Sequence, residues 1–132
     1  MIAVIFEVEL NVAEAYFARA AALRPLLDEI DGFISVERFQ SLSDPARVLS
    51  LSFWRDEVAI AQWRMLEAHR AAQAEGRARI FRDYRLRIAH VVRDYGMQER
   101  AEAPQDSQIA HSFVIPADRR ESRDPGDDGR IA

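Results

Sequence analysis

Cysteine and lysine are both absent from the 132-residue sequence. A chain without cysteine forms no disulfide and offers no thiol nucleophile or thiolate metal ligand. The 18 basic residues are all arginine, and 22 acidic residues leave a net charge of −4 and a pI near 5.4. Nucleic-acid-binding domains usually carry a basic surface, so this balance argues against a nucleic-acid partner.

Glycine is also scarce, with five residues and no G-x-G-x-x-G spacing, which excludes a glycine-rich phosphate loop of that type. The three histidines, His69, His90 and His111, show no paired spacing, which argues against a zinc or iron site. The N-terminus has no basic leader and reaches Glu7 and Glu9 early, and no apolar run is long enough to cross a membrane. We therefore expect a soluble, cytoplasmic protein with no membrane partner.

Apolar residues make up 48% of the chain, enough for one domain with a real core. Four stretches have the alternation or composition of strands: 2–10, 33–40, 47–55 and 83–95. Helical spacing follows the first stretch as far as Gly32 and follows the third from Asp56 to about Ala78. The order β-α-β-β-α-β predicts a ferredoxin-like α+β fold, with both helices on one face of a four-stranded antiparallel sheet.

The second face of that sheet is predicted to lie bare. We assign to it alternate residues of three strands, among them Glu7, Glu9, Ser50, Ser52, Trp54, Arg85 and Arg87. This mixture is too apolar for plain solvent surface and too charged for a dry core. We therefore expect a second copy of the chain to cover it around a partly polar cavity, with Glu7 and Glu9 paired to Arg85 and Arg87.

Composition divides the chain near Gly96. Residues 1–96 form the predicted domain, and the polar composition of 97–132 is typical of a tail. An apolar island, IAHSFVI, interrupts this tail, and we predict a docking segment near 108–116.

The second helical stretch contains Trp63 and His69. One side of it, predicted to face the sheet, carries Val58, Ala61, Met65, Ala68 and Ala72. Trp63 then lies nearly opposite. Two interpretations remain open: Trp63 and His69 pack at an interface and its rim, or they flank the mouth of a cavity where His69 can transfer a proton.

Two runs, EIDGFISVERFQSLSDPARVLSLSFWRDEVAIAQWRMLEAHRAAQAEGR and FRDYRLRIAHVVRDYG, resemble the antibiotic biosynthesis monooxygenase (ABM) family of the dimeric α+β barrel superfamily. The likeness covers about residues 1–96. It depends most on the G-F-I-S entry to the hairpin, the strand-ending F-W, and Trp63 with His69. The resemblance implies a homodimeric barrel that holds a small molecule.

Members of that family differ in activity: some oxygenate phenols or anthrones with O2 and no cofactor, and some degrade haem. The haem-degrading branch has an asparagine in the first strand, a tryptophan in the second helix and a histidine ten residues later. Here Trp63 matches, but the strand position falls at or beside Glu7, and Gln73 stands where that histidine is expected. The resemblance therefore favours oxidation of a small phenol-, quinol- or anthrone-like substrate without a cofactor.

That activity needs a wall for the substrate, a base and donors that stabilise an anion. The resemblance assigns His69 and Trp63 to catalysis, with His69 or Glu7 as the base and Trp63 as a stacking wall. The expected substrate-binding residues are Trp54, Glu7, Gln73, Tyr84, Arg85 and Arg87. The alternatives are a small-molecule-binding barrel without turnover, a haem-degrading monooxygenase and a purely structural dimer.

Overall fold

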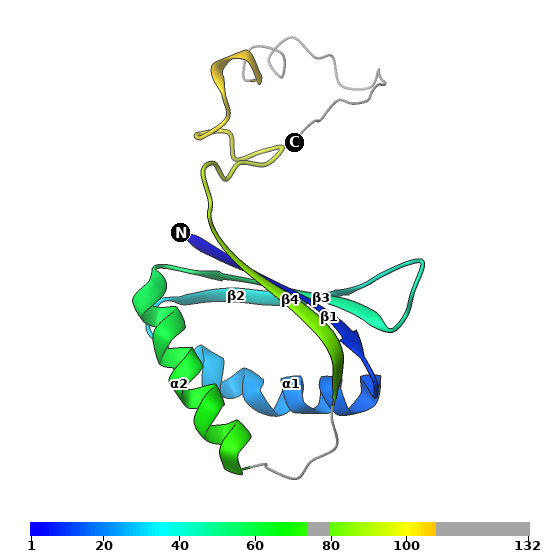
Figure 1. Ribbon diagram of the computed structural model, residues 1–132. Coiled ribbons are helices and arrows are strands. Elements are labelled where there is room, and N and C mark those ends of the chain that lie inside the picture. Colours follow the sequence, from blue (N-terminus) through cyan, green and yellow to red (C-terminus); the bar gives the residue numbers. More distant parts are fainter. Residues whose placement is uncertain (74–79, 108–132) are drawn as a thin grey trace. The chain divides into compact units, whose positions relative to one another are not determined.

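The computed structural model describes the chain over residues 1–73 and 80–107, and the side chains over 1–67 and 80–107. The elements follow one another as β1 (Ile2–Leu10), α1 (Ala13–Asp28), β2 (Phe33–Gln40), β3 (Arg47–Trp54), α2 (Glu57–Gln73) and β4 (Phe81–His90). All strand pairs are antiparallel in the order β2-β3-β1-β4, and both helices lie on one side of the sheet (Figure 1). The predicted ferredoxin-like α+β fold is confirmed. The fourth strand, predicted over 83–95, spans Phe81–His90 and so begins and ends earlier in the chain than predicted.

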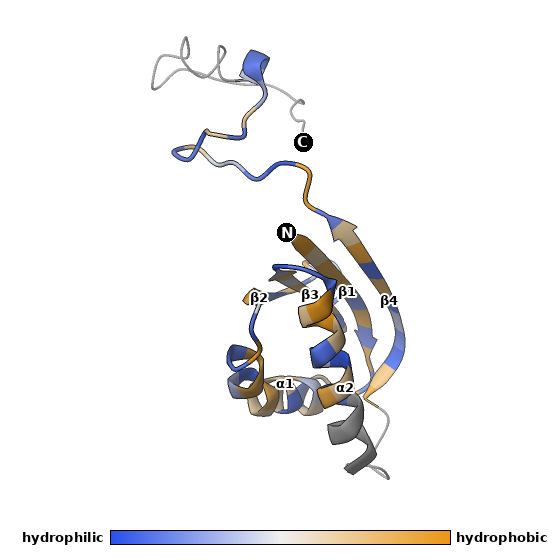
Figure 2. Ribbon diagram, turned by 90° about the vertical axis from the view of Figure 1, so that its left-hand side faces the viewer, coloured by the Kyte–Doolittle hydropathy of each residue, from blue (hydrophilic) through white to orange (hydrophobic). Residues whose placement is uncertain are grey.

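The core fills the space between the helices and the sheet. One cluster of buried residues comprises Ile2, Leu27, Trp54, Ala59 and Ile60. A second comprises Val8, Leu10, Tyr16, Val48 and Ile80. Even-numbered residues of β1 therefore face the helices, and odd-numbered residues face the opposite side of the sheet, which we call the open face. Figure 2 shows both helices on the other side of the sheet.

The face predicted for β3 is wrong. Trp54 pairs with Ile2, so Ser50, Ser52 and Trp54 point toward the helices, and Leu49, Leu51 and Phe53 lie on the open face. Trp54 is 2% exposed, its ring lies 5.1 Å from that of Phe33, and its Nε1 donates a hydrogen bond to Ser52 Oγ at 2.9 Å. The polarity of its residues predicts the wrong inward face for β3, because the more apolar residues of this strand lie on the side of the sheet that the helices leave uncovered.

The face predicted for α2 is also wrong. Val58 and Met65 are 64% and 75% exposed, whereas Ala59 and Ile60 are buried and Trp63 packs against them. Gly32 explains this rotation: it has a φ of +97°, and a Cβ placed there would come within 2.9 Å of Ala59 Cβ. Two small residues thus let α2 approach the start of β2 along its Ala59 side.

Asp56 caps the N-terminus of α2. Its Oδ1 accepts a hydrogen bond from the Ala59 backbone N–H at 3.0 Å, and its Oδ2 lies 3.0 Å from Arg55 Nε. The hydrogen bond from Ala59, followed by the contact with Arg55, lowers the pKa of the Asp56 carboxyl group.

We predict that Asp56→Ala lowers the melting temperature at neutral pH by a few degrees, a typical effect of losing a cap. A carboxyl group whose folded pKa lies below its unfolded pKa stabilises the protein above the unfolded value, and that contribution is lost as pH falls through the folded value. Circular-dichroism melts should therefore show a smaller gap between variant and wild type in acid. Asp56→Asn is the control that keeps the cap without the charge, and a gap independent of pH would contradict the assignment.

The contacts divide the chain into two units, Met1–Val91 and Val92–Ala132. In the described part of the second unit, Arg100 links two segments by hydrogen bonds. Its NH1 donates to the backbone oxygen of Gly96, and its NH2 donates to Ser107 Oγ at 2.9 Å. The predicted docking segment near 108–116, with His111, lies outside the described residues. Among the helices that the structure describes, none combines the length and apolar character needed to span a membrane.

Candidate functional site

An apolar strip on the edge strand β4 lies uncovered on the helix side of the sheet. The register against β1 places Tyr84, Leu86 and Ile88 on that side, and we call these three residues the β4 strip. They are 60%, 49% and 44% exposed. Figure 2 shows β4 at the edge of the sheet with apolar and polar residues alternating along it. The strip therefore offers apolar surface to a ligand on the side where the core lies.

Aromatic rings gather at one end of the strip. The Phe6 ring centroid lies 5.5 Å from that of Tyr84 and 5.6 Å from that of Phe81. Phe81 in turn lies 6.0 Å from both Tyr84 and Tyr16, in edge-to-face arrangements. Tyr84 is thus held on one side by other rings and exposed on the other, which suits contact with a flat or cyclic ligand.

The inward side of α2 carries Ala59, Trp63 and Glu67 at four-residue spacing, so the three side chains lie one above another. Ala59 is buried, Trp63 is half-buried against the core, and Glu67 is half-buried. The sequence-based position of Trp63, opposite the sheet-facing side, is therefore corrected: Trp63 belongs to the inward side.

Glu67 is the one ionisable residue of this inward row, and it was not among the site residues predicted from the sequence. Burial raises the pKa of its carboxyl group, and the positive charge of Arg19 on α1 acts in the opposite direction. The spacing A-x-x-x-W-x-x-x-E could have identified it, had Ala59 been recognised as the residue that faces the sheet.

Three predicted site residues lie on the opposite side of the sheet. Glu7, Arg85 and Arg87 share the open face, where Arg87 NH1 is 3.2 Å from Glu7 Oε1. The expected pairing of Glu7 is thereby confirmed. Glu9 pairs instead with Arg47 at 3.4 Å and Arg82 at 3.8 Å, so its expected partners are wrong.

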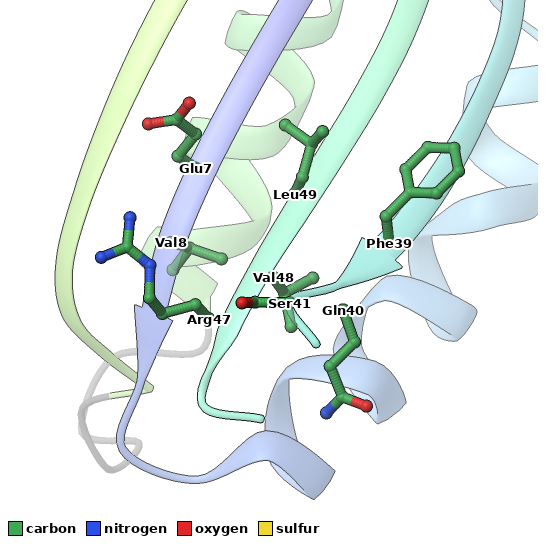
Figure 3. Close-up of a pocket in the computed structure, with 8 residues that line it drawn as sticks. All are labelled: Glu7, Val8, Phe39, Gln40, Ser41, Arg47, Val48 and Leu49. Carbon is green, nitrogen blue, oxygen red and sulfur yellow. The ribbon is translucent and has the colours of Figure 1, made fainter. Parts of the chain in front are cut away.

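A hollow of about 310 Å³ lies at the end of the sheet where the chain turns from β2 into β3, beside β1. Its lining consists of Glu7, Val8, Phe39, Gln40, Ser41, Arg47, Val48 and Leu49, drawn in Figure 3. Among the described residues, Glu7 is the one predicted site residue that lines it, and that carboxylate already has an arginine partner. The hollow therefore does not unite those predicted site residues whose side chains the structure describes.

The remaining predicted residues separate in the same way. Tyr84 and Trp63 are on the helix side, and Trp54 is buried in the core there. The side chains of His69 and Gln73 lie outside the described residues, so their roles remain predictions. Within the described part of the chain, no three His, Asp or Glu side chains come together as a metal site would need.

Known proteins resemble this chain in sequence as well as in fold. A family model described as antibiotic biosynthesis monooxygenase matches residues 1–75, more than half of the chain. The chain belongs to the antibiotic biosynthesis monooxygenase (ABM) family. A protein named jasmonate monooxygenase ABM, from Pyricularia oryzae, is 46% identical over 93 residues. That match spans 69% of this chain and 43% of the relative, so the chain covers less than half of the relative's length.

Solved structures share this ABM fold at low sequence identity. The haem degrader MhuD from Mycobacterium tuberculosis, solved with two haems in its active site, has a TM-score of 0.57 and 21% identity, over 73% of this chain and 100% of its own. A protein from Shewanella oneidensis has a TM-score of 0.59 and 20% identity, over 68% of this chain and 89% of its own. These likenesses establish the fold of the ABM domain and leave its substrate to be argued from the site.

Proposed function

We propose that this chain is a monooxygenase that oxidises a small, cyclic and largely apolar substrate with O2. The substrate lies on the helix side of the sheet, against the β4 strip and the inward side of α2. The observation that carries the proposal is the exposed apolar strip, with the ring of Tyr84 at one end, in a domain of the ABM family. Apolar walls with few polar groups are typical of sites for small molecules.

A phenol-, quinol- or anthrone-like substrate fits this site without a cofactor. A base removes a proton from the substrate, and the resulting anion passes one electron to O2. The two radicals combine as a hydroperoxide, which loses water, so that a CH2 group and O2 become a carbonyl group and H2O. The protein's part is to hold the ring, accept the proton and stabilise the anion.

The 46% identical relative supports a second substrate class, a jasmonate-like carboxylic acid. Hydroxylating its unactivated C–H bond consumes O2, two electrons and two protons and yields an alcohol and H2O. A two-electron donor must therefore be added to the assay. Dependence on such a donor separates the two substrate classes.

We predict that oxygen uptake occurs with a panel of anthrones and hydroquinones and stops when the substrate is consumed. Leu86→Asp places a charge on the β4 strip, where it opposes an apolar ligand, and should lower turnover at least tenfold. The half-exposed side chain of Leu86 makes the fold tolerant of the change, so the melting temperature should stay nearly constant.

Val58→Asp is the matched control, because Val58 is on the outward side of α2, and it should keep wild-type turnover. Ligand binding without oxygen uptake would replace this proposal with a binding module. Uptake that requires added haem would replace it with haem chemistry, despite Gln73 at the position of the branch histidine.

The open face supports a second proposal, that two copies of the chain pair through it. Ile5, Leu51 and Phe53 are apolar and lie at the centre of this face, and the helices cover the opposite side. Glu7 and Arg87 form an ion pair beside them. An apolar centre with a charged margin is typical of a protein interface, and the family resemblance implies a dimeric barrel.

A further inference from the structure

We propose that Glu67 is the base of this site, the group that takes the proton from the substrate before O2 is reduced. This assignment rests on the proposed monooxygenase function. It goes beyond it by replacing His69, the base expected from the sequence, with a carboxylate on the inward side of α2.

The position of Glu67 is the first support. It occupies the third place in the row Ala59, Trp63, Glu67, whose first two members face the core. A half-buried carboxylate in such a row costs stability, because its charged form loses hydration. An apolar residue would pack better there, so a role in binding or chemistry explains a carboxylate that packing does not require.

The charges around Glu67 are the second support. Among the residues whose side chains the structure describes, Arg19 of α1 is the charged residue whose field acts on this carboxyl group. Of the sheet residues facing the helices, the ionisable ones in the described part are Arg38, Tyr84 and His90, and Arg38 Nε already donates to Tyr16 Oη at 3.2 Å. No second carboxylate lies on these described inward-facing positions, so proton acceptance by a carboxylate falls to Glu67.

Burial gives Glu67 a pKa above that of an ordinary glutamate, which makes its carboxylate a stronger base. The proton moves from the substrate to a carboxylate oxygen of Glu67, and the electron pair of the broken bond stays on the substrate as the anion. The positive charge of Arg19 on α1 acts against this rise in the pKa of Glu67. The proton leaves again when the hydroperoxide loses water.

The test compares Glu67→Gln with wild type in oxygen uptake across a pH series. Glutamine keeps the shape and cannot accept the proton, so turnover should fall roughly a hundredfold or more, and the loss of activity toward acid pH should disappear. Glu67→Asp should recover part of the turnover. Exposed Glu57 in the first turn of α2 provides the control Glu57→Gln, which should leave the profile unchanged.

The melting temperature of Glu67→Gln provides a second test, because a base and a structural ion pair predict changes of opposite sign. Because the folded pKa lies above the unfolded value, the contribution of Glu67 is complete below the unfolded pKa and is lost as pH rises through the folded pKa. At neutral pH, Glu67→Gln should therefore melt at or above the wild-type temperature. A structural ion pair with Arg19 would instead make this variant less stable.

The outcomes separate the two proposals. If wild type consumes oxygen and Glu67→Gln retains turnover within threefold with an unchanged pH profile, the assignment of Glu67 is wrong and the monooxygenase proposal stands. If the loss of activity toward acid pH disappears in His69→Asn and persists in Glu67→Gln, His69 is the base. If wild type consumes no oxygen with any substrate, both proposals fail together.

Discussion

Trp54→Ala should lower the free energy of unfolding by about 3–5 kcal/mol, the usual cost of truncating a large buried aromatic side chain. Trp54 is 2% exposed, packs with Ile2, Leu27 and Ile60, and has its ring 5.1 Å from that of Phe33. Its removal leaves a cavity between β3 and the helices and takes the donor from Ser52 Oγ. Urea unfolding followed by circular dichroism measures the loss.

Two control variants identify the origin of that loss. Trp54→Phe keeps most of the apolar volume and should cost much less than alanine. Phe53→Ala removes a ring from the neighbouring position on the open face and should cost less than Trp54→Ala in the monomer. If Trp54→Ala changes the association constant strongly while the monomer keeps its stability, Trp54 belongs to an interface and the register described above is wrong.

The order and type of the elements could be predicted from the sequence because each depends on local pattern. Alternation marks the strands, helical spacing marks the helices, and SLSDPA marks the hairpin, where Ser41 N–H bonds Arg47 O at 2.9 Å. These signals involve residues close together in the chain. Six elements in the order β-α-β-β-α-β then leave few arrangements.

The faces of β3 and α2 could not be predicted, because each depends on contacts between distant segments. In β3 the more apolar residues, Leu49, Leu51 and Phe53, face away from the helices. The rule that the more apolar face of a strand packs against the core therefore fails here. In α2 the rotation depends on Ala59 meeting Gly32. No periodicity within either element contains that information.

Which of the predicted site residues share one side of the sheet could not be predicted, for the same reason. Glu7 and Tyr84 belong to neighbouring strands and lie on opposite sides of the sheet, because residue parity decides the side. Glu67 escaped notice because the wrong side of α2 was taken as inward. A chemical role can be assigned from sequence to residue types, but whether the residues converge depends on register and helix rotation.

Leu51→Asp should convert the expected dimer into a monomer. Leu51 lies on the open face between Ile5 of β1 and Glu37 of β2, on a central strand. A carboxylate at this position would be buried without a partner in the interface, at a cost of about 3 kcal/mol or more. That cost raises the dissociation constant at least about a hundredfold, since about 1.4 kcal/mol is tenfold. Light scattering at micromolar concentration measures the change.

The monomer of Leu51→Asp should keep its fold, because this side chain is half-exposed on a face that the helices do not cover. Leu51→Thr removes apolar area without adding a charge and should weaken the dimer less than aspartate does. Val58→Asp adds the same charge on the outward side of α2 and should remain dimeric. A wild-type chain that stays monomeric at micromolar concentration, or a Leu51→Asp variant that stays dimeric, would show that the apolar residues of the open face serve another contact.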